Sequence, residues 1–377
     1  MEFSIGEWTV LLITIAFGIL VILFLIQAVI RKRYAWSFLI SLVFGLLAGL
    51  AAIFGEVVFS GNTSLQFFSR SLHLNLYGFH FFFFYIFFER LISKKINSIR
   101  LSIMIALLLT QTIGLWLVFY NGINGFNTDI AWVLADIGYW TPALFVYLGL
   151  GVPIFIKTYL YTKEIRPIIL SAALILVGFG FIISMLNDIY FILGVFGSPA
   201  TAPDILTEIS EIANIFPSIG VILFVITYLT NIDYIYRLPN DNYLLMVLRK
   251  DGSPIHSVHF KTRKQVEIQD ILLSGMISAI NSVFKEVFKK EASVRNINSR
   301  GINILLEPGE NILAVIITDN VSYFLDQGLK RYVITFEQTF ANELKKKEEN
   351  LKVYESAIAL LNSIFPFFIV DYEATKK

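Results

Sequence analysis

Polar side chains inside otherwise apolar stretches are the residues of this sequence that could do chemistry. Asp136 and Asp188 lie within long hydrophobic runs, and His73 and His80 lie on one face of another. Such groups are costly inside a bilayer, so by default they mark a ligand or ion site. We therefore predict a ligand pocket. Its candidate residues are Glu56, His73, His80, Asp136, Tyr139, Trp140, Asn187, Asp188 and Asn214.

The residues near the two aspartates are largely aromatic. Carboxylates among aromatic rings would favour a cation or an amine. A lipid, a peptide and a small amine all stay open as the unknown small ligand. In a second interpretation, acidic residues at the ends of the apolar runs contact only headgroups or water. This second interpretation applies chiefly to Glu56, Glu208 and Glu211. The aromatic wall candidates are Trp132, Tyr139, Trp140 and Tyr190.

Known membrane chemistries do not fit these residues. A retinal protein needs a lysine in its last span, and residues 209–228 contain none. Membrane zinc hydrolases need histidines in a late span, whereas both membrane histidines share an early one. Intramembrane aspartyl proteases need a Gly-x-Gly-Asp context, which neither Asp136 nor Asp188 has. We therefore expect no enzyme activity, no catalytic residue, no metal ligand and no cofactor.

The overall composition is that of a membrane protein. The 377 residues are 56% hydrophobic, with 35 Phe, no Cys and a mean hydropathy of +0.69. A net charge of +1 gives no reason to expect a nucleic acid partner. A helix needs about 20 apolar residues to cross a bilayer. Seven stretches qualify: Trp8–Ile30, Ala35–Phe59, Leu72–Phe88, Leu101–Tyr120, Ile130–Ile156, Pro167–Leu193 and Ile209–Tyr228.

Basic residues predict the orientation of these spans. Eleven Lys and Arg lie on one side of the predicted membrane, and only Arg70 lies on the other. Because cytoplasmic loops carry the excess of Lys and Arg, we predict the N-terminus outside and the C-terminus in the cytoplasm. The expected location is the cell membrane, where the chain is multi-pass and contacts the lipid bilayer.

The segment Glu208–Asn242 joins two regions of different character. It lacks the Gly and Ser run of a flexible tether, so the second region is expected close to the first. A change of tilt at Pro217 is the expected relay, with Arg237 and Pro239 as further coupling residues. The predicted parts are a seven-helix transmembrane domain at 1–237, a linker at 238–242 and an α/β domain at 243–377.

The C-terminal region alternates strand and helix patterns. Asp251-Gly252 and Glu307-Pro308-Gly309-Glu310 are hairpin signals between apolar runs. The order predicts a five-stranded antiparallel sheet packed by helices. The expected strands are Leu244–Leu248, Ile255–Phe260, Ser293–Asn298, Ile302–Leu306 and Ile312–Thr318, and the expected helices are Asp270–Lys290, Ser322–Leu351 and Val353–Phe365.

This element order resembles the longin-like domains and the related roadblock family. The segments that carry the likeness are Gly252 in the first hairpin, Leu273–Ile280 in the first helix and Phe336–Phe340 in the long helix. The resemblance implies an α+β platform that binds proteins such as a small GTPase or its regulator, without catalytic residues. The membrane half resembles seven-span sensor modules in size and topology.

These features together predict a receptor-like membrane sensor that relays a signal to a longin- or roadblock-like domain in the cytoplasm. Its expected partners are the bilayer, an unknown small ligand and a cytoplasmic protein, and a homodimer stays open. Two alternatives are a membrane-anchored trafficking scaffold without a ligand, and a transporter or intramembrane enzyme with a regulatory tail.

Overall fold

The structure is a computed structural model in which the chain forms two compact units. One unit holds Met1–Glu89 and Ile96–Ile235, and the other holds Arg90–Lys95 and Tyr236–Lys377. The described residues are 5–31, 35–59, 61–196, 209, 213, 215–231, 234, 237, 240–262, 268–288, 294–299, 301–346, 351–366 and 368–375.

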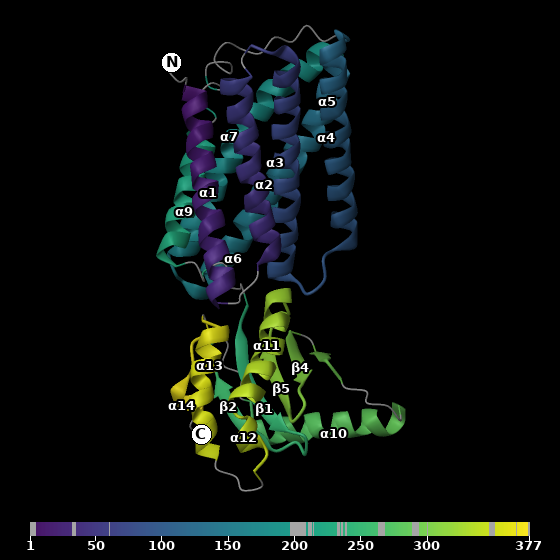
Figure 1. Cartoon of the computed structure of the whole chain (residues 1–377). Coiled ribbons are helices and arrows are strands. Elements are labelled where there is room, and N and C mark those ends of the chain that lie inside the picture. Colours follow the sequence, from purple (N-terminus) through teal and green to yellow (C-terminus); the bar gives the residue numbers. More distant parts are fainter. Residues whose placement is uncertain are drawn as a thin grey trace. The chain divides into compact units, whose positions relative to one another are not determined.

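The first unit is built from helices (Figure 1). Two of them contain π-helical segments, η1 after α2 and η2 between α5 and α6. The elements are α1 (Ile5–Arg31), α2 (Trp36–Ile53), η1 (Phe54–Val58), α3 (Thr63–Ile92), α4 (Ser98–Asn124), α5 (Asp129–Leu144), η2 (Phe145–Gly151), α6 (Val152–Thr162), α7 (Arg166–Val195) and α9 (Ile215–Thr230).

Six of the described helices are long and apolar enough to cross a membrane, which makes this a membrane-embedded chain. The seventh predicted span, Ile209–Tyr228, overlaps the apolar helix α9, which has 16 residues. That length is below the roughly 20 residues that a bilayer core requires. The six spanning helices are Trp8–Val29, Trp36–Ile53, Thr63–Ile92, Ser98–Asn124, Asp129–Thr162 and Arg166–Val195.

Glycines allow close approaches between helices of this unit. A Cβ atom on Gly114 of α4 would lie 2.6 Å from the Ala135 backbone nitrogen of α5. One on Gly138 of α5 would lie 2.5 Å from the Gln111 backbone nitrogen of α4. Small residues of this kind let two helix backbones pack against each other in a membrane. The α4–α5 pair is therefore held at two points where no side chain fits.

The phenylalanine run of α3 forms part of the core of the helical unit. Phe81, Phe84, Phe87 and Phe88 are all at most 4% exposed. Phe38 of α2 packs its ring against both Phe84 and Phe87. Rings that pack at tilted and edge-to-face angles add to the energy of burial. The run therefore joins α3 to its neighbours.

The second unit contains a five-stranded antiparallel sheet with strand order β2-β1-β5-β4-β3 (Figure 1). This confirms the predicted five-stranded antiparallel sheet. Gly252 has a φ of +92°, the left-handed conformation that the predicted Asp251-Gly252 hairpin requires. The strands are β1 (Asn242–Arg249), β2 (Pro254–His259), β3 (Asn296–Ser299), β4 (Ile302–Pro308) and β5 (Ile312–Thr318).

The sheet separates two apolar cores. Leu245 and Val247 of β1 face one core with Phe336, whereas Leu244 and Met246 face the other with Ile277. Successive residues of a strand point to opposite faces, so a strand buried on both sides reads as one continuous apolar run. The helical elements are α10 (Asp270–Phe288), α11 (Tyr323–Thr339), α12 (Ala341–Leu344), the 3₁₀ helix η4 (Leu351–Ser356), α13 (Ala357–Ile364) and α14 (Tyr372–Thr375).

The prediction of one long helix over Ser322–Leu351 was wrong. Helix α11 ends at Thr339, and the short α12 follows. Phe340 has φ −108° and ψ 23°, outside the helical region. Its ring is nevertheless buried with Phe336 and Tyr354 in one core. Residues spaced three or four apart can be buried in the same core even when the helix between them is interrupted. The apolar spacing of the sequence therefore did not reveal where the helix ends.

The segment Arg90–Lys95 packs within the second unit. The Asn320 side-chain amide donates to the Ile92 carbonyl oxygen at 2.9 Å, and the Tyr323 amide donates to the Ser93 carbonyl oxygen at 3.2 Å. The Lys94 ammonium forms an ion pair of 2.6 Å with Asp326. These contacts tie the segment to the start of α11.

Candidate ligand pocket

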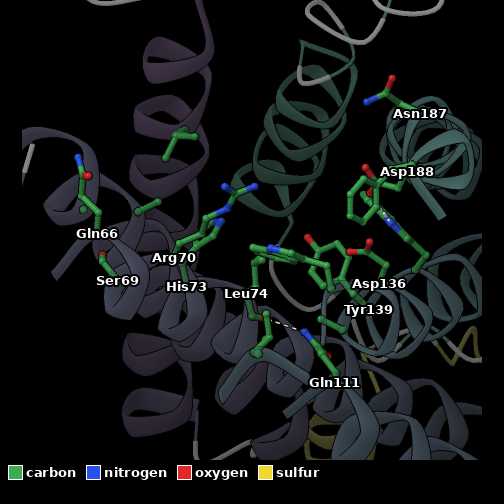
Figure 2. A pocket seen from close by; sticks show the side chains of 18 residues that line it. Gln66, Ser69, Arg70, His73, Leu74, Gln111, Asp136, Tyr139, Asn187 and Asp188 are labelled. Atoms are coloured by element: carbon green, nitrogen blue, oxygen red, sulfur yellow. Dashed lines mark hydrogen bonds between the residues drawn. The ribbon is translucent and has the colours of Figure 1, made fainter. Parts of the chain in front are cut away.

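A cavity of about 860 Å³ lies within the helical unit, among the helices that carry the predicted pocket residues (Figure 2). Its volume falls within the range of small-molecule sites, about 300–1,000 Å³. Most of its polar side chains come from α3, α5 and α7. The lining residues are Val10, Ala52, Gly55, Gln66, Ser69, Arg70, His73, Leu74, Gln111, Leu115, Trp132, Ala135, Asp136, Tyr139, Trp140, Asn187, Asp188 and Phe191.

Two carboxylates on neighbouring helices line this cavity, and they differ in their partners. The Trp140 indole nitrogen of α5 donates to Asp188 Oδ2 of α7 at 2.7 Å. Asp136 lies one helical turn before Trp140 on the same face of α5. In the described part of the chain, the Asp136 carboxylate accepts no hydrogen bond and forms no ion pair. A half-buried carboxylate without a partner is available to a bound cation.

Arg70 of α3 also lines the cavity, and the sequence interpretation did not include it. Its guanidinium lies over the Trp132 ring, 4.7 Å from the ring centroid. Across the residues that the structure describes, it forms no salt bridge with Asp136 or Asp188. The available signal was its isolation as the one basic residue on its side of the spans, one turn from His73.

His73 and Gln111 are two further polar side chains of the lining. The His73 Nδ1 donates to the Ala48 carbonyl oxygen at 2.9 Å, so this ring is anchored to α2. The Gln111 amide nitrogen donates to the Leu74 carbonyl oxygen at 2.7 Å. Gln111 is 1% exposed, and its Oε1 has no hydrogen-bond partner among the described residues. A buried acceptor without a partner is uncommon and calls for a donor.

The structure places the other predicted pocket residues differently. His80 does not line the cavity, and Glu56 lies in η1, where only its backbone is described. Asn214 lies outside the described residues. Six of the nine candidates therefore line one cavity: His73, Asp136, Tyr139, Trp140, Asn187 and Asp188.

His80 sits in a hydrogen-bonded site of its own. Its Nδ1 donates to the Ser41 carbonyl oxygen at 2.9 Å, and its Nε2 accepts from the Tyr147 hydroxyl at 2.8 Å. Both ring nitrogens are thereby satisfied in a side chain that is 2% exposed. The arrangement joins α3 to α2 and to the π-helical segment η2, so His80 has a structural explanation without a ligand.

The predicted coupling residues are only partly described. Pro217 lies in α9 and packs against α7, since a Cβ atom on Gly180 would lie 2.4 Å from its ring. Arg237 is described without a regular element, and Pro239 lies outside the described residues. The close Gly180–Pro217 contact joins α7, which carries Asp188, to α9.

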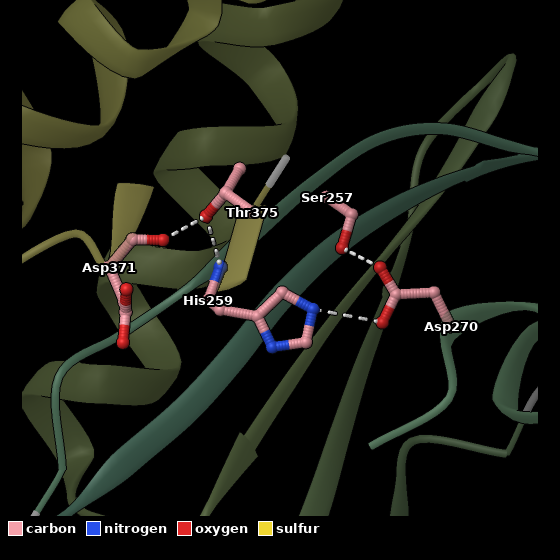
Figure 3. Close-up of polar contacts among 5 residues, drawn as sticks. All are labelled: Ser257, His259, Asp270, Asp371 and Thr375. Atoms are coloured by element: carbon pink, nitrogen blue, oxygen red, sulfur yellow. Dashed lines mark hydrogen bonds and ion pairs between the residues drawn. The ribbon is translucent and has the colours of Figure 1, made fainter. Parts of the chain in front are cut away.

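A second polar cluster lies in the C-terminal unit, around the start of α10 (Figure 3). The Ser257 hydroxyl donates to Asp270 Oδ2 at 2.5 Å, and His259 Nε2 lies 3.1 Å from Asp270 Oδ1. Burial raises the pKa of Asp270, but its bonds with His259 and Ser257 outweigh this, so the pKa is lowered overall. Both Ser257 and His259 contact the carboxylate, and Ser257 is not bonded to the imidazole. The cluster is therefore not a nucleophilic triad, and it ties α10 to β2.

Comparisons with known proteins gave no match. No family model matches the chain, and neither does any curated protein or solved structure. Within the described residues, no group of three or more His, Asp or Glu side chains could hold a metal ion. The function must therefore be inferred from the pocket and from the fold.

Proposed function

We propose that this protein is a receptor-like membrane sensor that binds a small organic amine in the cavity between α3, α5 and α7. The observation that carries the proposal is the Asp136 carboxylate, which lines a cavity of about 860 Å³ and has no partner among the described residues. Asp188 is the second carboxylate, and the Trp140 indole holds it by a hydrogen bond of 2.7 Å.

The energetics of a membrane helix favour this interpretation of Asp136. An ionised carboxylate inside an apolar helix bundle is costly unless a cation or hydrogen-bond donor is near it. A ligand ammonium group would supply both the charge and the donors. The rings of Trp132, Tyr139 and Trp140 line the same cavity and would attract the cation through their faces.

The relay is proposed to pass from α7 to α9. These helices pack through Gly180 against Pro217 and through Gly220 against Ala173 and Val177, without room for added side chains. A shift of α7 on binding would therefore displace α9, which precedes the C-terminal unit in the chain. The ligand must bind one arrangement more tightly than the other for this to act as a switch.

The C-terminal unit is proposed to lie in the cytoplasm and to bind a protein there. The charge asymmetry of the loops supports that orientation. The longin-like or roadblock-like element order suggests a small GTPase or its regulator as the partner. Full-length protein in lipid nanodiscs, incubated with nucleotide-loaded small GTPases, should retain one of them, and retention should change when the pocket is occupied.

The pocket is tested by calorimetry on the full chain in nanodiscs, with phenethylamine as the probe and 2-phenylethanol as its uncharged analogue. We expect the amine to bind and Asp136→Asn to weaken it about tenfold or more, because a charge-assisted contact is lost. Asp129→Asn is the matched control on the same helix, in an exposed first turn.

Two outcomes would contradict the proposal. Equal binding of the amine and the alcohol would show that the carboxylates take no part. Accumulation of radiolabelled phenethylamine inside proteoliposomes would identify a transporter in place of a sensor.

A further inference from the structure

The cavity holds charges of both signs, and their arrangement says more about the ligand than the acids alone. Asp136 and Asp188 come from α5 and α7, whereas Arg70 comes from α3 (Figure 2). Arg70 forms no salt bridge with either acid in the described part of the chain. Three charged groups thus line one cavity without neutralising one another by contact.

Trp132 lies next to both a basic and an acidic residue of the lining. Its ring lies under the Arg70 guanidinium, and it precedes Asp136 by one turn of α5. Residues four apart on a helix lie on the same face. The ring therefore offers a flat apolar surface between the guanidinium and the Asp136 carboxylate.

A guanidinium has five N–H donors, and stacking on a ring face satisfies none of them. Its planar fork matches a carboxylate with two parallel hydrogen bonds. A ligand that carries only an ammonium group would bring its positive charge close to Arg70 and offer those donors no acceptor. A ligand that also carries a carboxylate would serve both parts of the lining.

Resting on the proposed pocket function, we propose that the ligand is a small zwitterion with an ammonium group and a carboxylate. The ammonium group contacts Asp136 and Asp188, the carboxylate contacts Arg70, and the apolar part between them packs on Trp132. Gln111 Oε1, buried in the lining without a partner among the described residues, is an additional acceptor for the ammonium end.

Three matched probes test this assignment on the full chain in nanodiscs by calorimetry. Phenylalanine carries both groups, phenethylamine lacks the carboxylate, and 3-phenylpropanoate lacks the amine. We expect phenylalanine to bind about tenfold or more tightly than either, because each missing group loses one charge-assisted contact. A series from glycine to 6-aminohexanoate, each compared with the amine that lacks the carboxylate, covers other separations of the two charges.

Substitutions assign the two ends. Arg70→Gln should reduce the affinity for phenylalanine to that for phenethylamine and leave the amine unweakened, whereas Arg70→Lys should recover part of the preference. Asp136→Asn should weaken both probes. Arg166→Gln is the matched control, since Arg166 begins α7 and its guanidinium lies over the Tyr234 ring. Unchanged thermal unfolding shows that each variant is folded.

The result separates this inference from the proposal on which it rests. One outcome is that amines bind in a way that depends on Asp136 while no zwitterion in either series binds more tightly than the amine it is compared with. That result would support the amine pocket and contradict the proposal of a zwitterionic ligand. In that case Arg70 contacts lipid headgroups or water, and Arg70→Gln leaves every affinity unchanged. If no probe of any kind binds, both proposals are wrong.

Discussion

The aspartates of the two units contrast sharply in how they are paired. In the C-terminal unit, Asp326 bonds to Lys94 at 2.6 Å and Lys330 at 3.0 Å, and Asp270 bonds to Ser257 and His259. In the helical unit, Asp188 has one donor, and Asp136 has none among the described residues. The contrast supports the proposal that the charges of the helical unit serve ligand binding and not stability.

The surroundings make this contrast meaningful. A carboxylate near water can be solvated, so leaving it unpaired costs little, whereas one inside a bundle of apolar helices has no such alternative. Yet Asp136, which lies in the membrane-embedded unit, has no partner among the described residues. Stability alone would favour the opposite arrangement, and functional sites are where proteins commonly depart from it.

The comparison between the aspartates of the two units predicts the largest change in stability for a substitution of Asp326. Asp326→Ala should destabilise the C-terminal unit by about 2–3 kcal/mol, because a buried carboxylate with two cationic partners and a place in the first turn of α11 is lost. Amide hydrogen exchange in α11 would measure the loss. Glu310→Ala, at an exposed turn, is the matched control and should change little. An unchanged exchange rate in Asp326→Ala would remove the distinction between the two units.

His256 of the C-terminal unit is a partly buried ionisable group that departs from this pattern, and it gives the second prediction. Its Nε2 has no hydrogen-bond partner in the described part of the chain, and its ring packs near Phe336. Burial lowers the pKa of His256 to about 4. The unfolded chain therefore binds a proton more readily than the folded one, so stability is full above about pH 6.5 and falls as the pH drops toward 4.

The expected loss at pH 5 relative to pH 7 is roughly 1–2 kcal/mol, reduced from the full value because the side chain keeps part of its surface exposed. Hydrogen exchange in β2 at the two pH values would measure it. His256→Gln should abolish this part of the pH dependence, since the amide does not titrate. An identical pH profile in the variant would show that other groups carry the acid sensitivity.

The smallest expected change in stability is for a substitution in the pocket, and it is an increase where the other two are losses. Asp136→Asn should leave the helical unit as stable as before or raise its melting temperature by about 2–4 °C, roughly 1 kcal/mol, because a neutral amide costs less among apolar helices. Thermal unfolding in nanodiscs without ligand would measure it. A fall in melting temperature would mean that Asp136 stabilises the fold, and the comparison would then fail.

Much of the architecture was predictable because it follows from local rules. The two hairpin signals and the alternating apolar runs predicted the antiparallel sheet, and Gly252 adopts the positive φ that its turn requires. Six of the predicted membrane spans correspond to helices of spanning length. The seven-span count, the longin-like identity and the orientation stay predictions, since they depend on information beyond helix length and strand order.

The pocket was predictable only in part, because helical position does not fix depth or partners. His73 and His80 share a face of α3, yet the cavity reaches only His73, and Ser41 and Tyr147 satisfy His80. Arg70 was missed because a lone basic residue near the end of a span resembles an interfacial anchor. Its position over Trp132 depends on how α3 packs against α5, which the sequence pattern does not specify.

The glycine contacts between α4 and α5 have a consequence for how the cavity can change shape. Gly114 and Gly138 bring the two backbones so close that neither helix can slide without a collision. Gln111, Asp136 and Tyr139 therefore lie on a rigid pair of helices. The distance between spectroscopic labels on α4 and α5 should be the same whether the cavity is empty or occupied. A change in the shape of the cavity is then expected to come from the other helices that line it, among them α3 with Arg70 and α7 with Asp188.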